Sequence, residues 1–249
     1  MTSLTDVFCV ELPPSPPPEL LAWEEALLEW AECGGPEVLW FWESTATFVV
    51  VGYGQQVARE VYMDACNDRG IPILRRCSGG GTVVQGRGCL NYGVVLRFED
   101  RPELGTITDT NRFVLQRLAR ALSPLLGDPV GIQGHTDLVR RGPNGVAHKF
   151  SGNAQRRMRQ AVLFHGTLLL DLDLSLLTTL LPAPSWEPPY RDGRPHGAFV
   201  VNTGMDRGAV RAALAHEWGA TETLQFLPEE HHIKAMNARY GRPDWHLSR

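Results

Sequence analysis

The segment RRCSGGGTVV, residues 75–84, places two arginines, a serine and three consecutive glycines between a short apolar run and a β-branched one. The glycines remove side chains from this stretch, so its backbone N–H groups can approach a ligand closely and point at anionic oxygens. Arg75 and Arg76 stand beside the glycines, and a guanidinium is a natural bidentate partner of phosphate or carboxylate. The segment therefore predicts an anion-binding loop between two strands; a flexible turn with incidental surface charges is the alternative.

The loop matches neither of the common nucleotide-binding fingerprints. The sequence has no GxxxxGK[ST] segment, and SGGGT does not open a helix after a strand as GxGxxG does. A nucleotide bound here would therefore lie on a strand–turn–strand loop, which restricts the families with which the chain can be compared.

Composition predicts an ordinary soluble catalytic domain. The chain has 249 residues, of which 43% are hydrophobic and 21% charged. A net charge of -4 argues against a nucleic-acid partner. The N-terminus lacks a signal-peptide pattern and no run reaches about 18 apolar residues, so we expect no membrane association and a cytoplasmic location. The five cysteines show no CxxC or His-paired spacing, which favours incidental thiols over disulfides or zinc: Cys9, Cys33, Cys66, Cys77 and Cys89.

The chain is predicted to fold as one α+β domain behind a short lead-in. Because PPSPPP at 13–18 cannot form a regular helix or ladder, residues 1–18 are predicted to be a Pro-rich lead-in and 19–249 a single catalytic domain. Strands joined by hairpins alternate with helices, which favours a mixed, largely antiparallel sheet flanked by helices over repeated βαβ units. The predicted strands include 38–42, 47–52, 90–98, 161–174 and 221–226, and the predicted helices begin at residue 19 and also cover 110–126, 206–218 and 228–240.

Two further segments carry polar groups in otherwise apolar strands. Lys149 lies on the return strand of a hairpin whose turn is the Asn-Gly pair at 144–145, just ahead of Gly152. His165 and Gly166 interrupt a later apolar strand. Taken alone, the lysine is typical of an exposed strand position, and the histidine of a β-bulge with a hydrogen-bonded core side chain.

In combination, these segments carry a resemblance to a known family. They read RRCSGGGTVVQGRGCLNYGVVL, HTDLVRR, KFSGNAQRR and LFHGTLLLDLDL, in that order. The set resembles the lipoate-protein ligase A family of the biotin/lipoate ligase superfamily, whose members carry RRxSGGGxV, an NDL-like segment, KxSGxA and HHGTLL. Upstream, VLWFWESTATFVVVGYGQ is similar to the paired strands of the family that end in G-x-x-Q. The resemblance covers roughly residues 20–240 and implies a biotin/lipoate ligase-like catalytic fold.

The resemblance implies a two-step reaction. The carboxylate of lipoate or octanoate attacks the α-phosphate of ATP, with Mg²⁺ accompanying the triphosphate, and a lysine of an acceptor domain then takes the acyl group. The implied partners are lipoyl acceptor domains of 2-oxoacid dehydrogenase complexes or glycine cleavage H protein. An eight-carbon acyl chain offers about six methylenes, so an apolar slot would gain roughly 5 kcal/mol by burying it. Bringing a carboxylate and a phosphate together also requires fixed cations.

The family motifs also imply which residues form the site. Lys149 is the implied catalytic residue, bridging the carboxylate and the α-phosphate. Asp137 is a candidate metal-facing (Mg²⁺) or lysine-orienting carboxylate, and an aspartate that only satisfies backbone groups at the hairpin end is the alternative. The implied contacts of ATP or the adenylate are Arg76, Gly81, Thr82, Val83, Val84, Asp137 and Lys149. The implied contacts of lipoate or another acyl group are Arg75, Ser78, Gly79, Gly80, Gly81, Lys149, Gly152, Ala154, His165, Gly166 and Thr167.

The reaction itself has alternatives. Related enzymes transfer octanoyl from a carrier protein through an acyl-cysteine, but no cysteine follows Cys89, which disfavours this octanoyl or lipoyl transferase route. Gln85 stands where the family usually has a histidine, and a single histidine, His165, replaces a double one. A non-catalytic acyl-binding homologue therefore stays open. No separate C-terminal accessory domain is expected, so a separate accessory protein, or use of a preformed adenylate, also stays open.

Basic residues suggest where an acceptor would dock. Acceptor lipoyl domains are often acidic, and arginines cluster around the predicted hairpin; a merely solvated strand edge is the alternative. The cluster comprises Arg140, Arg141, Arg156, Arg157 and Arg159.

Overall fold

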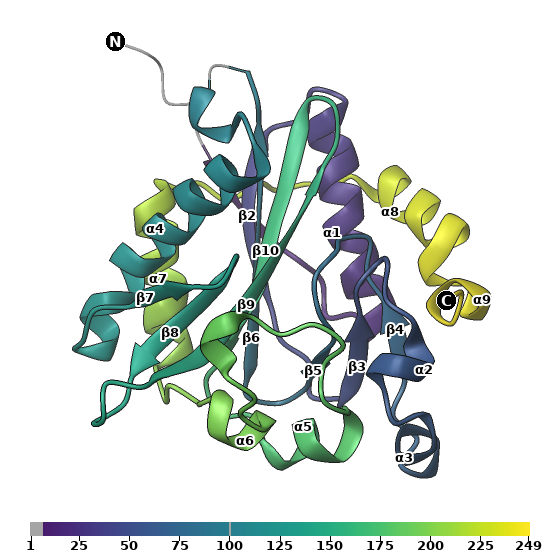
Figure 1. Cartoon of the computed structure of the whole chain (residues 1–249). Coiled ribbons are helices and arrows are strands. Elements are labelled where there is room, and N and C mark those ends of the chain that lie inside the picture. The colour runs from purple at the N-terminus through teal and green to yellow at the C-terminus, as the bar shows by residue number, and fades with distance from the viewer. Residues whose placement is uncertain (1–6, 100) are drawn as a thin grey trace.

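The computed structural model describes residues 7–99 and 101–249. A large seven-stranded sheet crosses the molecule between two layers of helices, and a three-stranded sheet lies beside it (Figure 1). Within the described residues, β1 and β2 run parallel, and the other neighbouring strands of the large sheet run antiparallel. This confirms the predicted α+β fold with a mixed, largely antiparallel sheet. In spatial order the strands are β1 (Val7–Glu11), β2 (Glu37–Trp42), β6 (Cys89–Arg97), β10 (Ala161–Leu169), β9 (Ala147–Arg157), β8 (Asp137–Arg141) and β7 (Gly131–Gln133).

Each face of the large sheet is covered by helices whose apolar sides form a separate core. One face packs against α4 (Ile107–Leu126) and α7 (Arg207–Trp218). The other packs against α1 (Pro17–Glu32), next to which lie α8 (Glu229–Ala235) and the π-helical turn η3 (Met236–Tyr240). In α4 and α7 apolar residues recur at helical spacing, so each of these helices buries one side, whereas α1 is buried at every position from 20 to 28. The two layers leave the lower end of the sheet in Figure 1 free for other elements.

The small sheet carries the glycine loop. Its spatial order is β4 (Ile73–Arg75), β3 (Phe48–Val51) and β5 (Val83–Gln85). The helices α2 (Val57–Glu60) and α3 (Met63–Asp68) connect β3 to β4. Because β4 and β5 flank β3, the loop between them passes across the end of β3. At Gly52 an added Cβ would lie 2.2 Å from the Gly80 carbonyl oxygen, so only glycine permits this approach.

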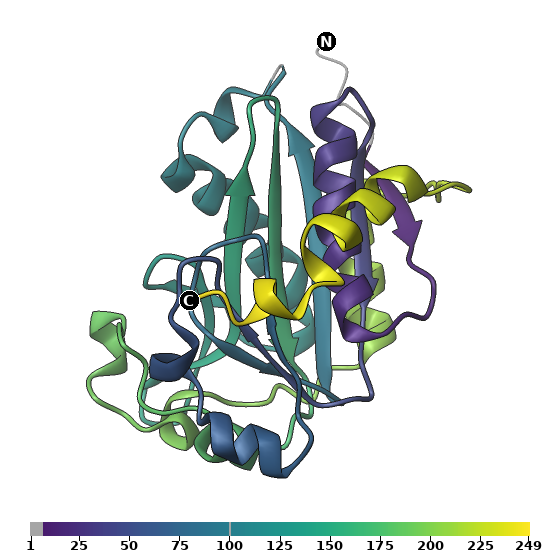
Figure 2. The ribbon, with the colours of Figure 1, turned by 90° about the vertical axis from the view of Figure 1, so that its right-hand side faces the viewer.

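Most of the remaining short elements lie around the free end of the large sheet or beside the small sheet. Residues 181–200, here called the covering segment, cross the lower end of the sheet in Figure 1. The C-terminal residues run from α8 towards the small sheet (Figure 2). Within the described chain, no helix combines the length and apolar character needed to cross a membrane. The short elements are η1 (Pro102–Leu104), α5 (Ser175–Leu180), η2 (Pro189–Arg191), α6 (His196–Phe199) and α9 (Pro243–His246).

Two predicted segments differ from the structure. Part of the predicted lead-in forms β1, because the apolar run VFCV finds a free edge beside β2; residues 1–6 of the lead-in lie outside the described residues. The predicted strand at 221–226 was wrong: only Thr223 forms a β-bridge there, with Cys9. The edge of β1 is short, so one bridge suffices to hold this segment before α8 begins.

Candidate active site

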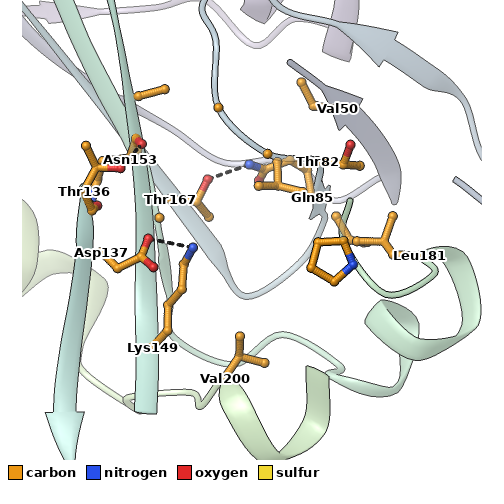
Figure 3. A pocket seen from close by; sticks show the side chains of 18 of the residues that line it. Val50, Thr82, Gln85, Thr136, Asp137, Lys149, Asn153, Thr167, Leu181 and Val200 are labelled. Carbon is orange, nitrogen blue, oxygen red and sulfur yellow. Dashed lines mark hydrogen bonds and ion pairs between the residues drawn. The ribbon is translucent and has the colours of Figure 1, made fainter. Parts of the chain in front are cut away.

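A cavity of about 530 Å³ lies between the small sheet and β8–β10 of the large sheet. The covering segment lines its remaining side, and Figure 3 shows side chains from all three parts directed into it. Its volume is in the range of small-molecule sites. The residues that the sequence predicted for the site line this cavity with three exceptions, Arg75, Ser78 and Gly79. Those in its wall are Arg76, Gly80, Gly81, Thr82, Val83, Val84, Asp137, Lys149, Gly152, Ala154, His165, Gly166 and Thr167.

Arg76 shapes the glycine loop from inside. Its Nη2 donates to the carbonyl oxygens of Gly79 at 2.6 Å and Gly81 at 2.8 Å, so the loop curls around the guanidinium. Burial lowers the pKa of Arg76 to about 10, which leaves it charged at neutral pH. The N–H groups of Gly80, Gly81 and Thr82 have no hydrogen-bond partner among the described residues. The loop thus combines a fixed cation with free amides, an arrangement suited to an anion.

Arg75 faces away from the cavity. It is fully buried, and its Nη1 donates to the carbonyl oxygens of Gly52 and Gln55, both at 2.8 Å. Its Nε donates to the carbonyl oxygen of Trp245 at 3.3 Å. Arg75 therefore ties the turn after β3 to the C-terminal residues, and its predicted contact with the acyl group has no counterpart in this geometry.

A buried chain of polar groups anchors the other side of the loop. Ser78 Oγ lies 2.6 Å from His165 Nε2, and His165 Nδ1 lies 2.7 Å from Glu24 Oε2. Trp42 Nε1 donates to the second Glu24 oxygen at 3.1 Å. Because Ser78 Oγ also accepts from Arg76 Nε, its hydroxyl is free to donate to His165, whose Nδ1–H then donates to Glu24. Ser78 is 1% exposed and outside the cavity wall, so this chain braces the loop instead of presenting a nucleophile.

Lys149 supplies the positive charge of the opposite wall. Its Nζ lies 2.7 Å from Asp137 Oδ1 (Figure 3), and its side chain is 27% exposed. Gly152 makes room for it, since an added Cβ would lie 2.8 Å from the ammonium nitrogen. The sequence contains only one other lysine, Lys234, which lies on α8 far along the chain. The cavity therefore places one lysine opposite the glycine loop.

The match to known proteins decides the family. The model of the lipoyl protein ligase A/B catalytic domain matches residues 16–194, more than two thirds of the chain. The chain belongs to this family. Its relatives include both kinds of enzyme. The octanoyltransferase LipM of Symbiobacterium thermophilum is 29% identical over 93% of this chain and 94% of its own. A putative lipoate-protein ligase A of Aeropyrum pernix is 32% identical over 65% of this chain and 56% of its own.

Solved structures of the family have the same fold. The bi-partite lipoate protein ligase of Thermoplasma acidophilum, whose structural analysis included its E2 lipoyl domain, matches with a TM-score of 0.81 and 24% identity over 98% of this chain and 96% of its own. A lipoate-protein ligase A bound with ATP matches with a TM-score of 0.79 and 24% identity over 97% and 98%. At this identity the likeness concerns the fold.

Where the family usually has a histidine, Gln85 takes part in a buried polar cluster. Its Nε2 donates to Asn91 Oδ1 at 2.9 Å and to Thr167 Oγ1 at 2.6 Å, and its Oε1 accepts from Asn91. All three residues line the cavity. Gln85 is therefore integrated into the cavity wall, with both ends of its amide satisfied.

The cysteines lie elsewhere. None of the described residues that line the cavity is a cysteine. Cys77 and Cys89 are buried, and burial raises their pKa values to about 11 and about 12. A thiol reacts as its thiolate, so these two are poor nucleophiles at neutral pH.

The described residues form no metal site of their own. They contain no group of three or more His, Cys, Asp or Glu side chains able to hold an ion. Asp137 already has a partner on each oxygen, Lys149 on Oδ1 and Tyr190 on Oδ2. This geometry fits the lysine-orienting alternative for Asp137, and Mg²⁺ stays a prediction that no protein ligand set supports.

Among the residues of the site that sequence reasoning missed, three make contacts that shape it: Glu24, Tyr190 and Trp186. Glu24 lies four residues after Leu20, which placed it on the buried side of the predicted helix and was a usable signal. Tyr190 and Trp186 come from the Pro-rich covering segment, where no periodic pattern indicates which side chains turn inward. Trp186 stacks on His135 at a ring-centroid distance of 5.6 Å, at the edge of the cavity.

Proposed function

We propose that this domain is a lipoate-protein ligase. It activates lipoate or octanoate with ATP to an acyl-adenylate and transfers the acyl group to a lysine of a lipoyl acceptor domain. One observation carries the choice of reaction: the glycine loop and the Lys149 ammonium face a single cavity that no described cysteine lines. The cavity thus offers charge for activating a carboxylate and no thiol for holding an acyl group.

The first step needs two anions in contact. A carboxylate oxygen attacks the α-phosphorus of ATP and pyrophosphate leaves, so negative charge accumulates where the two substrates meet. Lys149 approaches this point from β9, and Arg76 with the free loop amides approaches from the other side. Fixed charges of this kind stabilise the transition state more than water does. Leu21, Trp42 and Val50 line the cavity and provide apolar surface for the acyl chain.

In the second step the acceptor supplies the nucleophile. Its lysine amine attacks the acyl carbonyl, an amide bond forms, and AMP leaves with the electron pair. ATP as the co-substrate is supported by the ATP bound to a ligase of the same fold. Magnesium would arrive on the triphosphate, since it commonly binds through phosphate oxygens, water and few protein ligands.

Pyrophosphate release tests this proposal. The purified chain is mixed with Mg-ATP and either octanoate or lipoate, with and without a lipoyl acceptor domain. We expect pyrophosphate only when an acyl substrate is present, and acylated acceptor in a mass spectrum when all components are present. No pyrophosphate with either acid would overturn the ligase proposal.

The similarity to octanoyltransferase LipM over 93% of the chain favours a second candidate. In that reaction the acyl group would come from an acyl carrier protein, and ATP would not be needed. A second reaction, with octanoyl carrier protein in place of ATP and the free acid, separates the two: acylation of the acceptor there would support the transferase and contradict the ligase.

The arginines predicted to dock an acidic acceptor are spread along β9. Arg141 and Arg159 are exposed, but Arg141 pairs with Ala147 at the start of β9, whereas Arg159 follows its last residue. Arg156 and Arg157 also donate within the chain, to the carbonyl oxygens of Cys77 and Leu104. If docking is electrostatic, transfer to the acceptor slows steeply with added salt, while pyrophosphate release changes little. If added salt changed neither the rate of transfer nor the rate of pyrophosphate release, the electrostatic docking proposal would be wrong.

A further inference from the structure

We infer that Tyr190 is a positioning residue for Lys149, acting through Asp137. The Tyr190 hydroxyl donates to Asp137 Oδ2 at 2.8 Å, while Lys149 Nζ holds Oδ1 at 2.7 Å. Each carboxylate oxygen therefore has one partner, which fixes the plane of the carboxylate and the direction from which it meets the ammonium. Tyr190 does not line the cavity, although its neighbours Pro188 and Arg191 do.

The tyrosine is itself held in place. Arg194 Nη2 donates to the Tyr190 carbonyl oxygen at 2.8 Å, and its Nη1 donates to the carbonyl oxygen of Ala147 at 3.0 Å. Ala147 lies two residues before Lys149 on β9, so Arg194 joins the covering segment to the strand that carries the lysine. The Tyr190 ring also packs against Phe199, with 5.1 Å between ring centroids.

The chemistry of the three groups suits a fixed arrangement. Burial, together with the Asp137 charge, raises the pKa of Tyr190, so the phenol stays a neutral donor through the physiological range. A hydrogen bond to an ionised acceptor is also stronger than one between neutral groups. Without the hydroxyl, Asp137 can rotate and Lys149, which is partly exposed, can follow it. Reaction geometry is sensitive to such displacements.

The test is a double-mutant cycle on adenylate formation. Its variants are Tyr190→Phe, Asp137→Ala and the double variant, and Tyr62→Phe serves as a matched control because Tyr62 is 49% exposed on another face. Tyr190→Phe keeps the ring and removes only the hydroxyl. We expect it to lower kcat about tenfold, in line with the loss of one charge-assisted hydrogen bond, with a much smaller change in KM. In the Asp137→Ala background the same substitution should have no further effect.

The kinetic part of this test rests on the proposed ligase function, so a second readout is independent of it. The chain has two lysines, and Lys234 pairs with Glu29 on the surface, 69% exposed. Trace acetylation with acetic anhydride, quantified by mass spectrometry, gives the reactivity of Lys149 relative to Lys234 in the same sample. We expect this ratio to rise in Tyr190→Phe, because the loosened ion pair frees the amine, and not to rise further in the Asp137→Ala background.

The outcomes separate the two proposals. If wild-type protein releases no pyrophosphate but the labelling ratio follows the expected pattern, the ligase function fails and the positioning role stands. If pyrophosphate is released but Tyr190→Phe changes neither kcat nor labelling, or acts equally in both Asp137 backgrounds, the positioning role of Tyr190 is overturned.

Discussion

Arg76 and Lys149 both bring a positive charge to the cavity, but they are held in different ways. Arg76 is 7% exposed and donates to the carbonyl oxygens of its own loop. Lys149 has a 27% exposed side chain and a single carboxylate partner, Asp137. One charge is part of the scaffold of its wall, while the other lies at the end of a flexible side chain.

The difference teaches which contacts a substrate would have to displace. The hydrogen bonds of Arg76 to Gly79 and Gly81 define the loop, so an anion gains from the amides and the fixed charge without rearranging them. At Lys149 an incoming carboxylate and phosphate would compete with Asp137 for the ammonium. Both walls thus supply a positioned charge, but only the charge of Lys149 is held by a contact that the substrates would displace.

The largest expected effect comes from removing that charge. Lys149→Ala should fold normally, because the side chain is partly exposed, yet lose acyl-adenylate formation by roughly two orders of magnitude or more, as one preorganised charge contact contributes. Pyrophosphate release measures the loss, circular dichroism checks the fold, and Lys234→Ala is the matched control on the surface. Normal turnover in Lys149→Ala would show that acyl-adenylate formation does not need the charge of Lys149.

A substitution that weakens the support of the glycine-loop wall should lower the stability of the fold more than the rate of the reaction. Arg75→Lys keeps a positive charge but cannot reach both the turn at 52–55 and the Trp245 carbonyl, so we expect a loss of about 2 kcal/mol in the free energy of unfolding. Urea denaturation measures it. At urea concentrations well below the unfolding midpoint of Arg75→Lys, the turnover of this variant should fall far less than that of Lys149→Ala. A variant that is fully stable but inactive would instead place Arg75 among the substrate contacts.

Sequence patterns predicted the fold, and the family motifs identified 13 of the 36 residues that line the cavity. Helical spacing in α4 and hairpin signals around β8 and β9 reflect local preferences that the tertiary structure keeps. The segments 79–84 and 149–154 could be paired because the order of motifs matched a family, although local physics says nothing about their distance in space. The strand predicted at 221–226 was wrong in the opposite direction: the segment has β-branched residues, but it meets the outer edge of β1 through one bridge only, between Thr223 and Cys9.

Two aspects of the site were beyond sequence reasoning. The paired arginines at 75 and 76 look equivalent in the sequence, but successive residues of an extended segment point to opposite sides, and only Arg76 reaches the cavity. Tyr190 lies in the covering segment, residues 181–200, which contains five prolines, and no periodic pattern there indicates the direction of its side chain. Its contact with Asp137 joins residues 53 positions apart, which no local pattern encodes.

The smallest expected effect concerns the C-terminal support of the glycine-loop wall. His246 Nδ1 accepts the Arg75 backbone N–H at 3.1 Å, so its Nε2 carries the proton and donates to the Tyr240 carbonyl oxygen at 3.0 Å. Burial lowers the pKa of His246 below its usual value. His246→Asn keeps an acceptor for Arg75 but loses the second bond, which should cost about 1 kcal/mol at pH 8.

The stability difference between wild type and His246→Asn should depend on pH. The pKa of His246 is lower in the folded protein than in the unfolded chain, where it is about 6.5. Above about pH 6.5 the neutral histidine therefore contributes its full stabilisation. As the pH falls below this value, the unfolded chain binds the proton first, and this stabilisation is lost. The stability difference between wild type and His246→Asn should therefore shrink on acidification, as urea denaturation at several pH values can show. His216→Asn, on the exposed side of α7, is the matched control. Parallel curves for wild type and His246→Asn would contradict the lowered pKa of His246 in the folded protein.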